Sequence, residues 1–149
     1  MLPVSLAVLV SAVAASYLAI TLYDRKKEKM LKIKGVPPVV YVAGPFRADT
    51  PWGVEKNVRK AEQYALYLWG LGIPNICPHT QGRFFDKEIP DEIILLGMKQ
   101  LLRKCEAVLV IGRWQRSEGT KAEIADAEIH GIPVFFEIAK LVEWASSRN

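Results

Sequence analysis

Short runs of apolar, often β-branched residues alternate along this chain with longer stretches in which apolar residues recur every three or four positions. The short runs predict strands over residues 39–43, 73–77, 107–111 and 133–136. The longer stretches predict helices over 51–71, 91–104, 120–130 and 138–145. Because strands and helices alternate with short connections, we expect an α/β fold: a three-layer, doubly wound parallel sheet of the flavodoxin or Rossmann kind.

Two of the predicted helices have informative faces. The helix over 91–104 carries an apolar face formed by Ile94, Leu95, Met98, Leu101 and Leu102. In the helix over 120–130, Glu123 shares a face with Thr120, Ile124 and Ala127, so its carboxylate is expected to be partly buried. The other acidic residues of this segment, Glu118, Asp126 and Glu128, are expected to face solvent.

The N-terminal segment, residues 2–23, has no charged side chain. At 1.5 Å per residue, a helix of this length covers the ~30 Å hydrocarbon core of a bilayer. Six basic side chains follow within residues 24–34 and indicate the cytoplasmic side. We therefore predict a transmembrane anchor over 1–23, a basic linker over 24–35 and a cytoplasmic domain over 36–149, in a single-pass protein with its N-terminus outside. A cleaved signal peptide and a buried soluble helix are the alternatives.

Charge and cysteine usage exclude several classes of protein. Residues 24–34 carry the whole net charge of +4, and residues 35–149 hold 14 basic and 14 acidic side chains, so the domain does not have the basic surface of a nucleic-acid binder. Cys77 and Cys105 lie in apolar contexts without metal-ligand spacing, which predicts buried thiols and neither a disulfide fold nor a metal site. No P-loop and no G-x-G-x-x-G is present, so no cofactor is predicted.

Two loops follow strands at the edge of the sheet where ligands bind in such folds. After the first strand comes A-G-P-F-R, in which Gly44 and Pro45 leave room beside the backbone and Arg47 offers a planar fork for a phosphate or carboxylate. A solvated arginine after a simple turn is the alternative for this loop.

The loop after the third strand leads into S-E-G-T-K-A-E. Ser117, Gly119 and Thr120 open a helix, whose free N–H groups and dipole favour an anion. An ordinary capped helix start explains the same residues without a ligand.

Taken together, Y-V-A-G-P-F-R after a strand and S-E-G-T-K-A-E at a later helix start resemble the nucleoside 2-deoxyribosyltransferase superfamily, which includes 2'-deoxynucleoside 5'-phosphate N-hydrolases. The similar stretch runs from about residue 39 to residue 136. The resemblance implies that Glu123 is the nucleophile, which attacks the anomeric carbon and holds the sugar covalently, and that Tyr41 orients its carboxylate.

The resemblance also indicates a substrate class. Members that act on free nucleosides tend to carry Asp six residues before the nucleophile, whereas this chain has Ser117, as the nucleotide hydrolases do. The hydrolases bind the 5'-phosphate with a first-loop arginine, which Arg47 matches. A (deoxy)nucleoside 5'-monophosphate held by Arg47, Ser117 and the Gly119 N–H is therefore the expected ligand, with no cofactor.

One departure from the family concerns the acid that protonates the leaving base. Active members usually have an Asp where this chain has Met98. Asp86 or Asp91 could replace that acid, and His79, at the end of the second strand, could line the base pocket. Active members are also homo-oligomers that share residues near the C-terminus, a role open to Ser146, Ser147 or Asn149.

Two hypotheses compete with the enzyme. One is a nucleotide-sensing module on a membrane anchor, which the Met98 departure favours. The other is an oligomerising scaffold with a vestigial pocket.

Overall fold

The computed structural model describes residues 35–85 and 88–148. Its centre is a four-stranded parallel sheet in the order β2-β1-β3-β4, formed by β1 (Val40–Ala43), β2 (Asn75–Ile76), β3 (Ala107–Val110) and β4 (Val134–Phe135). All four predicted strands are confirmed, although each is shorter than expected. The chain runs from β1 to β2 on one side and from β3 to β4 on the other, so the strand order reverses between β1 and β3. The connections that follow these two neighbouring strands therefore lead to opposite edges of the sheet.

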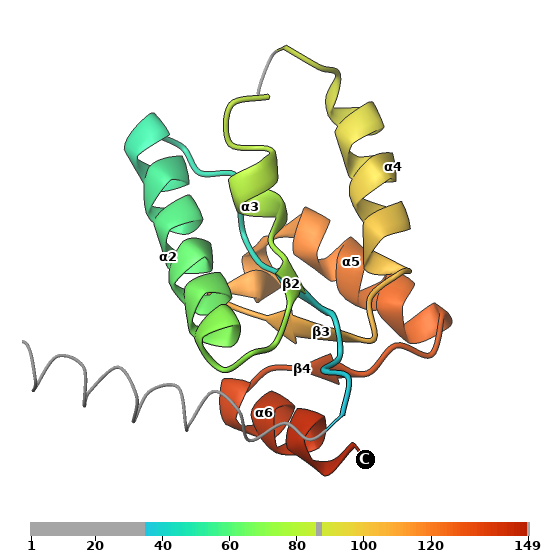
Figure 1. Ribbon diagram of the computed structural model, residues 1–149. Coiled ribbons are helices and arrows are strands. Elements are labelled where there is room, and N and C mark those ends of the chain that lie inside the picture. The colour runs from blue at the N-terminus through green and yellow to red at the C-terminus, as the bar shows by residue number, and fades with distance from the viewer. Residues whose placement is uncertain (1–34, 86–87, 149) are drawn as a thin grey trace, which may run out of the picture.

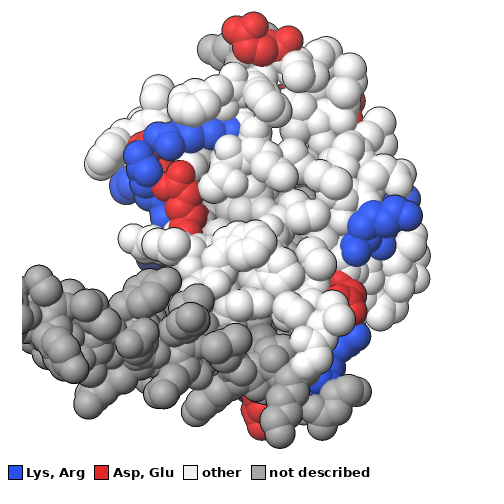
Figure 2. Space-filling model, viewed as in Figure 1, with Lys and Arg blue, Asp and Glu red and all other residues white. Residues whose placement is uncertain are grey.

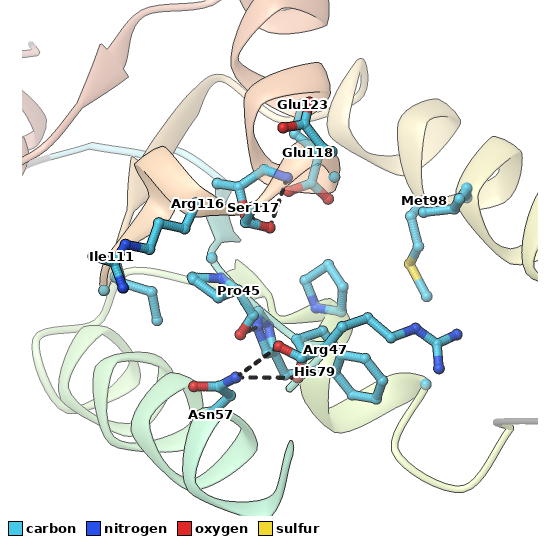
Figure 3. A pocket seen from close by; sticks show the side chains of 18 of the residues that line it. Pro45, Arg47, Asn57, His79, Met98, Ile111, Arg116, Ser117, Glu118 and Glu123 are labelled. Carbon is cyan, nitrogen blue, oxygen red and sulfur yellow. Dashed lines mark hydrogen bonds between the residues drawn. The ribbon is translucent and has the colours of Figure 1, made fainter. Parts of the chain in front are cut away.

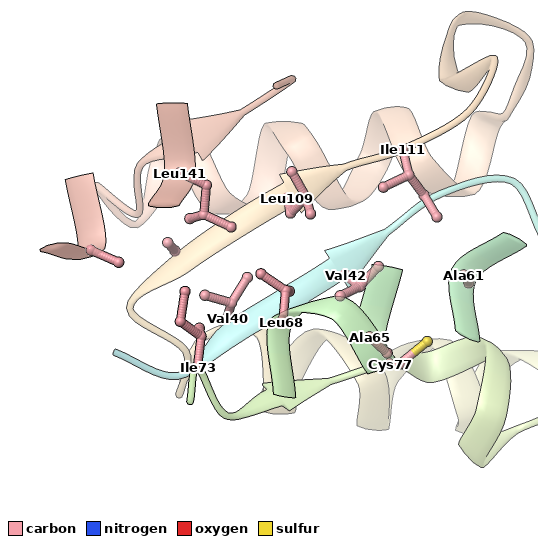
Figure 4. Packing of buried hydrophobic residues seen from close by; sticks show 12 residues of the cluster. Val40, Val42, Ala61, Ala65, Leu68, Ile73, Cys77, Leu109, Ile111 and Leu141 are labelled. Atoms are coloured by element: carbon pink, nitrogen blue, oxygen red, sulfur yellow. The ribbon is translucent and has the colours of Figure 1, made fainter. Parts of the chain in front are cut away.

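Helices cover both faces of the sheet (Figure 1). Helices α2 (Pro51–Gly70) and α6 (Ile138–Ser147) pack on one face, where Val40, Val42, Leu109 and Ile111 meet the buried side chains of both helices (Figure 4). Helix α5 (Glu118–Ile129) and the end of α4 (Asp91–Leu102) pack on the other face against Tyr41, Ala43, Val108 and Val110. The side chains of successive residues in β1 and β3 therefore pack against helices on opposite faces of the sheet, because side chains alternate between the two faces along a strand.

Helix α4 forms as predicted, but little of its apolar face is buried. Of the five residues on that face only Leu102 is buried; Ile94 and Met98 are half-buried, and Leu95 and Leu101 are exposed. The helix extends away from the sheet and approaches it only at its C-terminal end (Figure 1), and the side of the helix seen in Figure 2 shows few charged side chains. The apolar pattern correctly predicted a helix here but not the depth of its burial, because α4 extends past the carboxyl edge of the sheet.

Four further differences concern two short helical elements, the start of α5 and one side chain. The segment after β2 forms a short helix, α3 (Pro78–Gln81), and the loop after β3 contains a turn of 3-10 helix, η1 (Trp114–Arg116). Helix α5 begins at Glu118, two residues before the predicted start. The expectation that Asp126 faces solvent is wrong: it is buried and accepts two hydrogen bonds from Arg103, Nε at 2.9 Å and Nη2 at 2.7 Å, which offset the cost of burying the carboxylate.

The predicted anchor and basic linker fall almost wholly outside the described residues. Within residues 35–85 and 88–148, no helix combines the length and the apolar character needed to cross a membrane. Cys77 and Cys105 are both buried and free, as predicted.

The burial of α2 yields a direct test of the core. Leu68 is fully buried between α2 and the sheet, whereas Leu66 on the same helix is 75% exposed. Leu68→Ala should therefore lower the free energy of unfolding by about 2–5 kcal/mol, because it removes buried methyl groups and leaves a cavity. Leu66→Ala should change it by less than about 0.5 kcal/mol. Urea unfolding of the two variants, followed by tryptophan fluorescence, measures both; equal losses would contradict this packing.

Candidate functional site

A cavity of about 700 Å³ opens where the strand order reverses, at the carboxyl ends of β1 and β3 (Figure 3). Its walls come from the loop after β1, the start of α5, α3, and one side of α4. Ligands of open α/β sheets bind at this position because the two connections leave in opposite directions and part the loops. Of the predicted site residues, the cavity is lined by Gly44, Pro45, Arg47, His79, Asp91, Ser117, Gly119, Thr120 and Glu123.

Glu123 lines the floor of the cavity and is hydrogen-bonded to Tyr41, which lies beneath that floor and does not itself line the cavity. The Tyr41 hydroxyl donates to Glu123 Oε1 at 2.7 Å, although the two residues are 82 positions apart in the sequence. Tyr41 is fully buried in the layer beneath α5, so its ring is fixed by packing. Among the described residues nothing donates a hydrogen bond to Glu123 Oε2, and Glu123 lines the cavity, so this second oxygen is open to a ligand.

Burial controls the ionisation of this pair. Desolvation raises the pKa of Glu123 to about 7, while the hydrogen bond from Tyr41 and the positive charge of Lys99 oppose that rise. Desolvation and the neighbouring Glu123 carboxylate raise the pKa of Tyr41 well above its ordinary value. Tyr41 therefore keeps its proton and remains a donor, and Glu123 is a carboxylate that changes charge close to neutral pH.

The start of α5 forms one side of the cavity. Ser117 is the N-cap: its Oγ accepts from the Thr120 N–H at 3.3 Å and from the Thr120 hydroxyl at 2.9 Å. The hydrogen of the Ser117 hydroxyl is therefore left to be donated elsewhere. A Cβ placed on Gly119 would meet no atom within 4 Å, so the first turn of the helix faces open space. From the sequence, a capped helix start and an anion site are alternatives for these residues. In this geometry Ser117 can cap the helix and still take part in an anion site.

The loop after β1 is held by its neighbours. A Cβ on Gly44 would come within 2.6 Å of Ile111 Cγ1, so this glycine allows the ends of β1 and β3 to pack closely. This packing explains the glycine without the ligand for which the sequence predicted it to leave room. Asn57 on α2 donates to the carbonyl oxygens of Phe46 at 3.2 Å and Arg47 at 3.3 Å. Sequence reasoning missed Asn57; its only signal is an amide side chain, unfavourable in a helix interior, within α2.

His79 also serves this loop. Its Nε2 donates to the Pro45 carbonyl at 3.0 Å, which leaves Nδ1 as the unprotonated nitrogen, buried and without a partner among the described residues. Burial lowers the pKa of His79, so the ring stays neutral. The ring packs edge-on against Phe46 at 5.9 Å between centroids. His79 is therefore placed to position the loop rather than to supply a proton.

The two predicted residues at the mouth, Arg47 and Asp91, lie together. Arg47 Nη2 donates to Asp91 Oδ2, so the arginine joins the first loop to α4. Figure 3 shows Arg47 reaching toward the Met98 side of the cavity and Arg116 on the opposite side. Asp86 and Asn149 lie outside the described residues, and Ser146 and Ser147 bond to carbonyl oxygens of their own helix at 2.7 and 2.9 Å.

Several cationic residues of the site were missed by sequence reasoning. Lys60, Arg113 and Arg116 line the cavity, and the positive charge of Lys99 on α4 lowers the pKa of Glu123. The sequence carried little signal for them, because isolated basic residues are common on solvated surfaces and only the fold brings these to one edge.

Comparison with known proteins identifies a family whose activity is not known. A family model described as a domain of unknown function (DUF7768) matches residues 38–137, a range that contains every residue lining the cavity. Among curated proteins, none matches the chain.

The buried carboxylate gives a prediction for stability. Because the folded-state pKa of Glu123 exceeds its unfolded value, ionisation opposes folding as the pH rises through 4.5 to about 7, and the penalty persists above that. Glu123→Gln keeps an acceptor for Tyr41 without the charge, so it should stabilise the fold by up to about 3 kcal/mol at pH 8 and by little at pH 4. Thermal unfolding against pH measures this; Glu128→Gln, on an exposed position of α5, should show no such trend.

Proposed function

We propose that this chain, which belongs to the DUF7768 family, cleaves the N-glycosidic bond of a (deoxy)nucleoside 5'-monophosphate through a covalent glycosyl ester on Glu123. The observation that carries the proposal is the Tyr41–Glu123 hydrogen bond of 2.7 Å at the floor of the cavity, which fixes one carboxylate oxygen and leaves the other facing the ligand space. The resemblance of the two loop motifs to the nucleoside 2-deoxyribosyltransferase superfamily supports the same chemistry.

The reaction follows from this geometry. Glu123 Oε2 attacks the anomeric carbon, and the electrons of the C–N bond leave with the base. Tyr41 stays protonated and orients the carboxylate, because its hydroxyl is buried and its own ionisation is strongly disfavoured. Water, or a second base in a transferase, then displaces Glu123 from the glycosyl ester. This is the two-step sequence of a retaining glycosidase.

The phosphate subsite proposed for this substrate lies at the start of α5. The Ser117 hydroxyl hydrogen, the Gly119 N–H and the positive end of the helix dipole favour an anion there. Arg116 directly precedes the cap and lines the same cavity. Because Arg47 is engaged with Asp91, we assign the phosphate first to Arg116 and Ser117, with Arg47 closing the mouth.

A nucleotide-sensing module is the second candidate. Met98 lines the cavity at the position where active relatives of the resembled superfamily carry an acid, and Asp91 is tied to Arg47. A pocket that binds a nucleotide without cleaving it would retain the anion subsite and lose turnover.

The setting of the site is part of the proposal. We retain residues 2–23 as a membrane anchor with the domain on the cytoplasmic side, a homo-oligomeric state, and the doubly wound, flavodoxin-like arrangement that the strand order β2-β1-β3-β4 supports.

Base release tests the proposed function. The full-length protein should release free base from at least one member of a panel of ribo- and deoxyribonucleoside 5'-monophosphates, measured by chromatography. Glu123→Gln should lower kcat by at least about 1,000-fold, because the amide is no nucleophile. Glu128→Gln, on the same helix but outside the cavity, is the matched control and should retain activity. Binding of a nucleotide without release by the wild type would instead support the sensing module.

The pH profile tests the role of the charges around Glu123. Because the nucleophile must be ionised, kcat/KM should fall about tenfold per pH unit below a midpoint near pH 7. Lys99→Gln removes a charge that lowers the pKa of Glu123, so its midpoint should move to higher pH. An unchanged midpoint in Lys99→Gln, or a profile without an acid limb, would contradict this assignment.

A further inference from the structure

A second cavity adjoins the first at the carboxyl ends of β3 and β4. It has a volume of about 600 Å³ and shares Lys60, Ile111, Gly112 and Arg113 with the cavity of Glu123. The two spaces are therefore neighbouring lobes separated by the chain that leaves β3. A ligand larger than a mononucleotide can extend from one lobe to the other over this shared border.

The second lobe has an aromatic wall. The rings of Trp114 and Phe136 lie 5.2 Å apart at 37°, and Tyr64 of α2 also lines the space. Phe136 directly follows β4 and is 52% exposed. Aromatic side chains that face an open space provide stacking surfaces for a base.

The border between the lobes is cationic. Lys60 and Arg113 line both cavities and Arg116 lines the first, and none of the three forms an ion pair with another described residue. Other arginines of the domain, such as Arg59, Arg83 and Arg103, are paired with carboxylates. Three unpaired cations beside one another exceed what a single phosphate requires and suit a diphosphate.

The opposite end of the first lobe is apolar and offers no evident acid. Phe46, Ile94 and Met98 line it. Besides Glu123, the carboxylates among its described lining residues are Asp91, which is paired with Arg47, and Glu118, which is 88% exposed and paired with Lys121. A purine or pyrimidine leaves readily only when a proton is supplied, whereas a pyridinium leaves as a neutral ring without one.

We infer that the substrate is a pyridinium dinucleotide that spans both lobes: its pyridinium riboside lies beside Glu123, its diphosphate on Lys60, Arg113 and Arg116, and its second base on Trp114 and Phe136. The inference rests on the proposed function. Glu123 Oε2 forms a bond to the anomeric carbon, the C–N electron pair neutralises the ring nitrogen, and the ring departs without a proton. The oxygen of a water molecule then bonds to the anomeric carbon, the bond from that carbon to Glu123 breaks, the carboxylate is restored, and one proton is released to solvent. Because the chain lacks G-x-G-x-x-G, side-chain cations rather than a glycine-rich turn hold the diphosphate.

The experiment compares three substrates on the full-length protein: the nicotinamide–adenine dinucleotide NAD⁺, nicotinamide mononucleotide, which lacks the second nucleoside, and the nucleoside monophosphate panel. Nicotinamide or base release is measured by chromatography. The variants are Lys60→Ala and Phe136→Ala. Their matched controls are Lys56→Ala, one turn earlier on α2, and Phe84→Ala, an exposed phenylalanine; both control residues lie outside the two cavities.

We expect NAD⁺ to be cleaved with the highest kcat/KM, and cleavage to be lost in Glu123→Gln. Phe136→Ala should raise KM for NAD⁺ about tenfold and change kcat/KM for nicotinamide mononucleotide by less than about twofold, because the shorter substrate has no second base. Lys60→Ala should also raise KM for NAD⁺ about tenfold, because it removes a cation from the diphosphate. The two control variants should behave as wild type on both substrates.

Three results would overturn the inference, and they separate it from the proposed function. If the protein releases base from a monophosphate but does not cleave NAD⁺, the pyridinium dinucleotide is not the substrate, and the proposed function still holds. Equal effects of Phe136→Ala on NAD⁺ and on nicotinamide mononucleotide would show that the second base does not bind in the second lobe. If no base or nicotinamide is released from any of the substrates, both the proposed function and this inference are wrong.

Discussion

The hydrogen bond between Tyr41 and Glu123 is the contact on which the site depends. It joins the central strand β1 to helix α5 across the layer boundary, at 2.7 Å. Both partners are desolvated: Tyr41 keeps its proton and donates a hydrogen bond to the Glu123 carboxylate, and this bond opposes the rise in the pKa of Glu123 that burial causes. A half-buried carboxylate without this donor would be costlier to ionise, and an ionised carboxylate is what nucleophilic attack on a sugar requires.

The rest of the architecture places this pair at the bottom of an open space. Because the strand order reverses between β1 and β3, the loops after these strands separate and leave their carboxyl ends accessible. Close packing of Gly44 on Ile111 keeps the two strand ends together, while Asn57 and His79 hold the backbone of the first loop by its carbonyl oxygens. Gly44, Asn57 and His79 line the same cavity as Glu123, so these contacts hold the wall that faces it.

The polar groups around the cavity divide into two ends with different chemistry. The α5 end combines a helix start with unpaired cations, which suits phosphate. The α4 end is largely apolar, and the ion pair between Arg47 and Asp91 lies at its mouth. A nucleotide has the same division, with an anionic tail, a sugar and a flat ring. The match supports nucleotide chemistry more than any single motif does.

Sequence patterns alone determined the α/β class, all four strands and the longer helices, because hydrophobic period reports which face of an element is buried. The pattern also placed Glu123 on an inward helical face, and the resemblance of the two loop motifs, rather than the pattern alone, singled it out as a site residue. Sequence patterns could not show how deeply α4 is buried or that Asp126 has a partner in Arg103, because both depend on where other elements end. The convergence of Lys60, Arg113 and Arg116 was likewise decided only by the tertiary structure: these residues lie on different elements, and their shared edge exists only once the strands have paired.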